Sequence, residues 1–259
     1  MLLAVIIFVI AFTMTMTGRG GGNFYVITLA LSGITMHHAA TTGQFILIIS
    51  SLSASFFFGK KRTISWKLFL IIGILTAVSA FFGGFLSELI SGKALKYIFS
   101  FLLLIAATLM LRPVKERELI KKSRLNWEVK SGKHRFLIDV KLALPAIILS
   151  GFFAGMVGVS GGSFLVPLMV LACNVPMKIA VGTSTTMVSA TAFMGFLGHT
   201  LSGHFDLRAA IPLAIAGAVG GILGSKTALK SKPKFLKLLF AITTFLAAVV
   251  MVLNAILTK

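Results

Sequence analysis

The sequence predicts an all-α, polytopic membrane protein with two inverted repeats, each with a glycine-broken short helical hairpin and three full transmembrane helices. The first observation behind this prediction is composition. Of the 259 residues, 57% are hydrophobic and 12% are charged, and the mean hydropathy is +1.01. The second observation is a series of apolar runs, each near the ~20 residues that span a bilayer. The third is an internal repeat of a glycine-rich segment.

The repeat begins at Gly18 and returns at Gly158, 140 residues later. The first copy reads GRGGGNFYVITL and the second reads GVSGGSFLVPLM. Further along, LKYIF at Leu95 is matched by LKLLF at Leu236, with one residue of drift. A duplicated glycine-rich break in such an apolar chain suggests two half-sites that meet within a membrane.

Each half of the chain divides into five expected helical elements. In the first half these are Leu2–Thr17, Asn23–Ile34, Ala39–Phe58, Trp66–Ile90 and Leu95–Leu111. In the second half they are Lys141–Val157, Ser163–Ala172, Lys178–Gly198, Leu207–Leu229 and Lys237–Leu257. The second element of each half is only about half a membrane thickness long at ~1.5 Å per residue. We therefore expect the first two elements to form a hairpin bent at the glycines, whose short arm re-enters the membrane.

The basic residues give an independent test of this topology. An odd number of elements per half requires the two halves to be inverted. With the N-terminus outside, 21 of the 25 Lys and Arg residues fall on the cytoplasmic side, as the positive-inside rule expects. Only Lys93, Lys96, Arg208 and Lys259 fall on the other side. We therefore expect a multi-pass protein of the cytoplasmic (inner) membrane.

These boundaries divide the chain into three parts. Residues 1–111 are the first transmembrane repeat, 112–140 a basic cytoplasmic linker, and 141–259 the second repeat. The linker contains Pro113 followed by mixed charge. It is either a solvated connector that sets topology or a short amphipathic helix lying on anionic lipid.

The glycine clusters are the candidate binding elements. Three glycines within five residues weaken a helix, and each cluster precedes a fresh apolar run. A helix that restarts there presents free backbone N–H groups and the positive end of its dipole, which suits an anion. We expect the amides of Gly21, Gly22, Gly161 and Gly162 to hold the oxygens of a small anionic substrate near the midplane.

Polar side chains near the two breaks extend the candidate site. Their hydroxyl and amide groups are costly in lipid, so a cavity or a protein surface is expected beside them. These residues are Asn23, Ser160, Ser163, Thr183, Ser184 and Gln44. The hydroxyl groups could instead bond to the carbonyls of their own helices. Arg19 supplies either a fixed positive charge for an anion or an anchor at the cytoplasmic edge, and His37 is the best candidate proton carrier.

Other glycines have a structural interpretation. Gly217, Gly221 and Gly224 fall on a small-residue face that favours close helix packing.

Several classes of function are disfavoured. The six acidic residues place no carboxylate at the predicted midplane, which argues against a cation transporter. No spacing of His, Cys or acidic residues predicts a metal site, and no cofactor or nucleotide motif is present. The membrane segments hold no nucleophile–base pair, so we do not expect an enzyme. The formal charge of +19 lies in loops between spans and has no nucleic-acid-binding motif beside it.

The second glycine cluster also resembles a known family. The residues Gly151, Gly155, Gly158, Gly161, Gly162, Val166 and Pro167, followed by AVGTS at Ala180–Ser184, resemble the TauE/SafE sulfite exporters. This resemblance implies a permease for sulfite or small organosulfur anions such as sulfonates, commonly in the export direction. The first copy departs from the pattern, with Arg19 and Gly20 in place of Val159 and Ser160, and Ile27 in place of Pro167.

The sequence therefore predicts a secondary transporter, an exporter of a small sulfur-containing anion across the cytoplasmic membrane. An anion channel of the same fold and a permease for another small solute are the alternatives. A non-transporting membrane partner stays open as well, and a homo-oligomer is compatible with the sequence.

Overall fold

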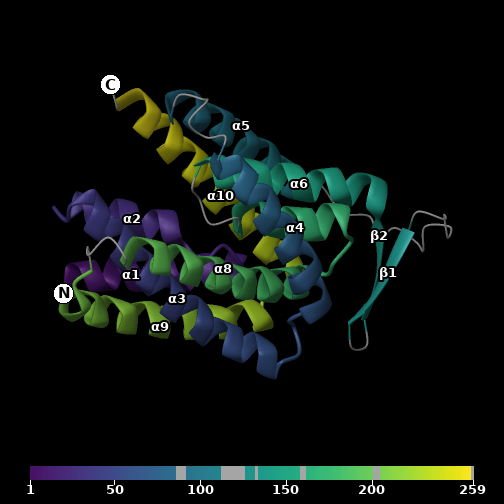
Figure 1. Cartoon of the computed structure of the whole chain (residues 1–259). Helices are drawn as coiled ribbons and strands as arrows, with labels where there is room; N and C mark the ends of the chain where they lie inside the picture. Colours follow the sequence, from purple (N-terminus) through teal and green to yellow (C-terminus); the bar gives the residue numbers. More distant parts are fainter. Residues whose placement is uncertain (86–91, 112–125, 132–133, 158–161, 201–204, 258–259) are drawn as a thin grey trace. The chain divides into compact units, whose positions relative to one another are not determined.

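The computed structural model describes residues 1–85, 92–111, 126–131, 134–157, 162–200 and 205–257 (Figure 1). Within these residues the chain forms α-helices, one short π-helix and one two-stranded antiparallel hairpin. The predicted all-α class is therefore confirmed, with the hairpin as the exception in the described part. Three of the described helices contain stretches long and apolar enough to cross a membrane, at His38–Lys60, Leu207–Lys230 and Pro233–Val250.

The helices lie close to the predicted bounds. In the first half they are α1 (Leu2–Thr17), α2 (Gly22–Leu31), α3 (Met36–Lys60), α4 (Trp66–Phe85) and α5 (Gly92–Leu111). In the second half they are α6 (Val140–Val157), α7 (Gly162–Pro167) with the π-helix η2 (Leu168–Ala172), α8 (Met177–Thr200), α9 (Leu207–Lys230) and α10 (Pro233–Leu257). α10 begins four residues before its predicted start because proline is favoured in the first turn of a helix. The end of the predicted fourth element lies outside the described residues.

The second short arm is not one continuous α-helix. Pro167 ends α7, and the chain continues as the π-helix η2. Proline has no N–H to donate to the preceding turn, so a change of helical hydrogen bonding at this point has a local cause.

The described part of the linker forms a β-hairpin. Strands β1 (Asn126–Ser131) and β2 (His134–Asp139) are antiparallel, and Trp127 faces Ile138 across the ladder. The alternative of an amphipathic helix is therefore wrong for these residues, and residues 112–125 lie outside the described part. In β1 the apolar Trp127 and Val129 alternate with polar side chains, a period of two that suits a strand, whereas β2 carries the continuous apolar run Phe136–Ile138.

The helices pack into two compact units, each of which contains segments from both halves of the sequence. Unit 1 comprises Met1–Ile64 and Val181–Ser231, and unit 2 comprises Ser65–Ala180 and Lys232–Lys259. These are packing units, so the predicted division at residues 111 and 140 into repeats stays a prediction.

In unit 1, α9 packs between α1 and α3 through two rows of glycines. A Cβ atom added at Gly220 would lie 2.5 Å from the carbonyl oxygen of Phe8, and one at Gly224 would meet the carbonyl oxygen of Phe12. From the first contact to the second, the residue number rises by four in α9 and by four in α1, so the two helices run in the same direction. The structure confirms that these glycines serve helix packing.

The second glycine row of α9 faces α3. Gly217 lies against Ile46 and Gly221 lies against the backbone of Ser50. The two helices again advance together, so α3 and α9 are also parallel.

Helix α8 runs in the opposite direction. Thr186 contacts Ser55 of α3 through a 3.1 Å hydrogen bond, and Phe196 contacts Phe45 with ring centroids 5.6 Å apart. Residue numbers rise along α8 as they fall along α3. The third elements of the two sequence halves are therefore antiparallel within unit 1.

Unit 2 is built around two helix pairs, α5 with α10 and α4 with α6. A Cβ atom added at Gly151 of α6 would lie 2.7 Å from the carbonyl oxygen of Thr76 in α4. The side chains of Leu103, Met110, Leu236 and Phe240 are buried in the core of this unit.

Candidate functional site

The first glycine cluster forms a sharp break between α1 and α2. α1 ends at Gly18, whose φ of 77° is left-handed and whose N–H donates to the carbonyl of Thr15 at 3.1 Å. The N–H of Arg19 reaches back to Met14, also at 3.1 Å. This is the double hydrogen bond of a glycine C-cap, followed by two further left-handed glycines, Gly20 and Gly21. α2 begins directly after them, and no side chain caps its N-terminus.

The break is closely surrounded by three helices of unit 1. A Cβ atom at Gly20 would meet Val188 of α8 and would lie 2.6 Å from Leu47 of α3. A Cβ atom at Gly21 would lie 2.9 Å from Met14 of α1. Glycine at both positions is therefore required by the positive φ and by the lack of space.

The hydroxyl patch of α8 reaches this break. Ser184 Oγ donates a 2.7 Å hydrogen bond to the carbonyl oxygen of Gly18, between residues 166 positions apart in sequence. Two residues earlier, Gly182 lies against the backbone of Thr63, where an added Cβ atom would be 2.6 Å from that carbonyl oxygen. Thr183 and Ser184 are fully buried. Two segments singled out from the sequence are thus in direct contact.

Arg19 brings a positive charge into the same break. Its side chain is only 5% exposed although it lies between two membrane helices. Burial of a guanidinium group is costly and favours a surrounding rich in hydrogen-bond acceptors or a negative charge. The break therefore combines a buried cation, a helix N-terminus and the neighbouring hydroxyl group of Ser184.

The other predicted residues of the first half fall into two groups. Gly21, Gly22 and Asn23 lie at the break and in the first turn of α2. Gln44 lies on α3 between two contacts with this region: a Cβ atom at Gly43 would be 2.9 Å from Val26 of α2, and Leu47 borders Gly20. Its Oε1 atom is buried and has no hydrogen-bond partner among the described residues. His37 lies in the first turn of α3, and its side chain is outside the described part.

The second glycine cluster is described only in part. Ser160 and Gly161 lie outside the described residues. Gly162 and Ser163 are buried at the start of α7 in unit 2. The predicted convergence of the two breaks at one site stays a prediction.

A run of serines on α3 was missed by the sequence interpretation. Ser50, Ser51 and Ser55 are buried, and Ser55 bonds to Thr186 of α8. The hydroxyl group of Tyr25 in α2 lies 3.4 Å from Ser50 Oγ. The signal was present in ISSLSAS at residues 49–55, with four serines in a membrane helix.

Not every hydroxyl of the α8 patch is available to a substrate. Thr185 Oγ1 donates to the carbonyl of Val181 at 2.8 Å, in its own helix. Ser189 likewise donates to Thr186 at 2.8 Å. Thr185 and Ser189 therefore bond to carbonyls of their own helix, which was the alternative to a substrate-facing role. The hydroxyl group of Ser184 is also bonded within the protein, but its acceptor lies beyond its own helix, at Gly18 after α1. In the described residues no group of three His, Cys, Asp or Glu side chains gathers as a metal site.

Ser184→Ala is expected to lower the free energy of unfolding by about 1 kcal/mol, because the buried carbonyl of Gly18 loses its donor. Ser189→Ala is the matched control, since it removes a hydroxyl bonded within its own helix. Thermal unfolding of both purified variants measures the difference. Equal stability of the two variants would show that the Ser184–Gly18 bond contributes nothing to the break.

The fold and the composition together define a polytopic helical membrane protein with a glycine-broken hairpin, the class to which many secondary transporters belong. The chain belongs to the sulfite exporter TauE/SafE family, whose family model matches residues 3–251. The resemblance seen in the glycine motif is thereby confirmed.

Several similar proteins are described as probable membrane transporters. The probable membrane transporter protein YunE of Bacillus subtilis (strain 168) is 26% identical over 245 residues, covering 90% of this chain and 89% of the relative. YdhB of the same organism, also a probable membrane transporter protein, is 26% identical over 227 residues, covering 87% and 89%. A probable membrane transporter protein of Methanocaldococcus jannaschii is 25% identical over 261 residues, covering 93% and 90%. No solved structure matches the chain significantly. The protein is a membrane transporter.

Proposed function

We propose that this transporter is a secondary exporter of a small sulfur-containing anion, such as sulfite or an organosulfonate, across the cytoplasmic membrane. The observation that carries the anion preference is the buried Arg19 in the left-handed glycine break, beside Ser184 and the N-terminus of α2. The guanidinium group of Arg19 and the first backbone N–H groups of α2 offer positive charge and hydrogen-bond donors at one place. The sulfur chemistry and the export direction rest on the description of the family.

The inverted repeat is part of this proposal. Its support is the antiparallel packing of α3 and α8, the third elements of the two halves. A second support is the parallel packing of α3 and α9, because the fourth element of an inverted second half would run along the third element of the first. Rocking of such repeats around a shared site is a common route to alternating access.

The orientation is proposed on similar grounds. α3 and α9 both end in lysines, at Lys60 and Lys230, and their parallel packing places these ends on the same side. The positive-inside rule would make this side cytoplasmic. Because α1 is parallel to α9, the N-terminus would then be outside.

A ligand panel tests the proposed substrate class. The purified full-length protein is heated in the presence of sulfite, sulfate, thiosulfate, sulfoacetate, taurine or chloride. We expect one sulfur oxyanion to raise the melting temperature selectively, since a ligand that binds only the folded state at 100 times its Kd adds about 2.7 kcal/mol. Thr183→Val and Ser163→Ala are expected to weaken this shift.

The panel has a clear negative outcome. A well-folded protein whose melting temperature responds to none of these anions would overturn the anion site. A shift that persists unchanged in both variants would instead remove Thr183 and Ser163 from it.

A further inference from the structure

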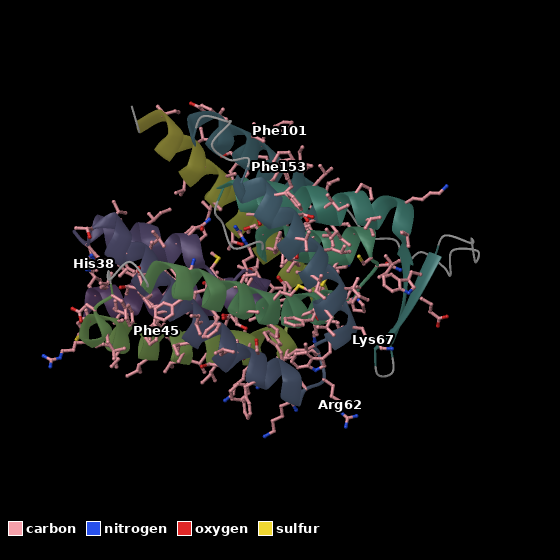
Figure 2. The ribbon with its side chains drawn as sticks, in the orientation of Figure 1. His38, Phe45, Arg62, Lys67, Phe101 and Phe153 are labelled. Carbon is pink, nitrogen blue, oxygen red and sulfur yellow. The ribbon has the colours of Figure 1, made fainter. Side chains whose placement is uncertain are left out.

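One end of unit 1 carries five exposed cations on two neighbouring helices. Lys60, Lys61 and Arg62 end α3, and Lys226 and Lys230 lie in the last turns of α9. Figure 2 shows the Arg62 side chain on the outside of this end, with His38 marking the opposite end of α3. We call these five residues the cationic end.

The two helix ends are held next to each other. The parallel packing of α3 and α9 brings their C-termini to the same side. Lys226 Nζ lies 4.8 Å from the centroid of the Phe57 ring, a cation–π contact between α9 and α3. The cations of the two helices thus form one patch and are not two separate helix termini.

The patch has no acidic residue near it within unit 1. The sequence of this unit contains one acid, Asp206, which caps the opposite end of α9. Twenty residues separate Asp206 from Lys226, a rise of about 30 Å. Within unit 1, no acidic side chain therefore lies within a Debye length of the cationic end at physiological ionic strength.

The cations continue exposed apolar stripes on both helices. On α3, the exposed side chains of Leu52 and Phe56 precede Lys60 at four-residue intervals, on one helical face. On α9, Val219, Leu223, Lys226 and Lys230 follow one another at intervals of four, three and four residues, which also keeps them near one helical face. Each stripe changes from hydrocarbon to cation at the end of a candidate membrane span. A phospholipid has the matching order of groups, with apolar acyl chains followed by a negatively charged phosphate.

Arg62 occupies a backbone position that glycine would fill at lower cost. The φ angle of Arg62 is 55°. The N–H of Arg62 donates to the carbonyl oxygen of Gly59 at 2.9 Å, and the N–H of Thr63 donates to that of Phe58 at 3.0 Å. This is a helix C-cap of the kind that usually carries glycine. Arginine here gives up some stability, which suggests that its charge has a use at this end.

We propose that the cationic end binds the headgroups of anionic phospholipids, which hold the ends of α3 and α9 at the membrane surface. The phosphate contacts the cations, and the acyl chains lie along the exposed stripes of Leu52, Phe56, Val219 and Leu223. This surface is independent of the transported solute.

The test uses the full-length protein reconstituted in nanodiscs of phosphatidylcholine with 0 to 40% phosphatidylglycerol of the same acyl chains. The melting temperature is measured at each composition. Wild-type protein is expected to become more stable as the phosphatidylglycerol fraction rises. Neutralising one cation, as in Lys226→Gln, is expected to raise the fraction needed for half of the effect about fivefold, the factor that corresponds to 1 kcal/mol.

Two variants keep the result interpretable. Arg208→Gln removes an exposed arginine from the opposite end of α9 and is expected to leave the response unchanged. Arg62→Gly is expected to weaken the response while the protein in pure phosphatidylcholine stays as stable as wild type, because glycine relieves the left-handed backbone.

Four outcomes would overturn the proposal. One is a wild-type protein that ignores phosphatidylglycerol, and another is a response that Lys226→Gln and Arg62→Gly both retain in full. The third is an equal stabilisation by millimolar inorganic phosphate in phosphatidylcholine discs, which would assign the patch to a free anion. A response lost in Arg208→Gln as well would show a general effect of charge, which also contradicts a localised lipid site.

Discussion

Gly221→Ala is expected to lower the free energy of unfolding by about 2–3 kcal/mol, because the added methyl group overpacks a helix interface. The Cβ atom would meet the carbonyl oxygen of Ser50 on α3, which is backbone and cannot rotate away. α9 would have to move off α3, and the neighbouring contact of Gly217 with Ile46 would open with it. Close glycine packing is a main source of helix association in membranes, where no hydrophobic effect joins the helices.

The matched control for this prediction is Gly73→Ala in α4. A Cβ atom at Gly73 has no neighbour within 4 Å, so the same substitution there removes only the flexibility of glycine. It is expected to be neutral or stabilising by up to ~1 kcal/mol. Thermal or denaturant unfolding of the two variants in one detergent gives the comparison. If Gly221→Ala were as stable as Gly73→Ala, α9 would not pack on α3 as described.

The bounds of the helices could be predicted because apolar length and breakers report them directly. α1 begins at Leu2 and ends at Thr17, as expected from the apolar run before Gly18. The glycine cluster predicted a break, but not its left-handed backbone, since glycine is compatible with many conformations. The hairpin β1–β2 was missed because the alternation of β1 is short, the apolar run of β2 has only three residues, and both lie in a charged segment.

The candidate site could be predicted only in the part that depends on local sequence. Residues 18–22 were expected to break the helix, and they do. The contact between Ser184 and Gly18 depends on how α8 packs on α1, which no pattern within either segment reports.

Hydrogen bonds between helices, such as those of Ser55 with Thr186 and of Ser184 with Gly18, could not be predicted from the sequence. A serine in a membrane helix usually bonds to its own carbonyls, and Ser189 does so. Sequence alone does not distinguish such a residue from Ser184, whose hydroxyl bonds to another helix. The distinction requires the neighbouring element in place.

Arg19→Gln is expected to abolish anion transport while leaving the protein folded. The guanidinium group is buried in the break, so its replacement removes a positive charge from the site itself. A bound anion would lose a charge-assisted hydrogen bond worth about 1.5–3 kcal/mol, which corresponds to roughly a 10- to 150-fold weaker affinity.

The measurement is flux of labelled sulfite in proteoliposomes, together with the melting temperature with and without sulfite. Arg19→Lys is expected to keep part of the flux because it retains the charge but loses the planar fork of donors. Arg208→Gln, an exposed arginine at the far end of α9, is the matched control and is expected to transport normally. Normal flux and a normal sulfite shift in Arg19→Gln would make Arg19 an anchor of the hairpin. The anion site would then have to depend on backbone amides and hydroxyl groups alone, and the case for an anion over a neutral solute would lose its strongest support.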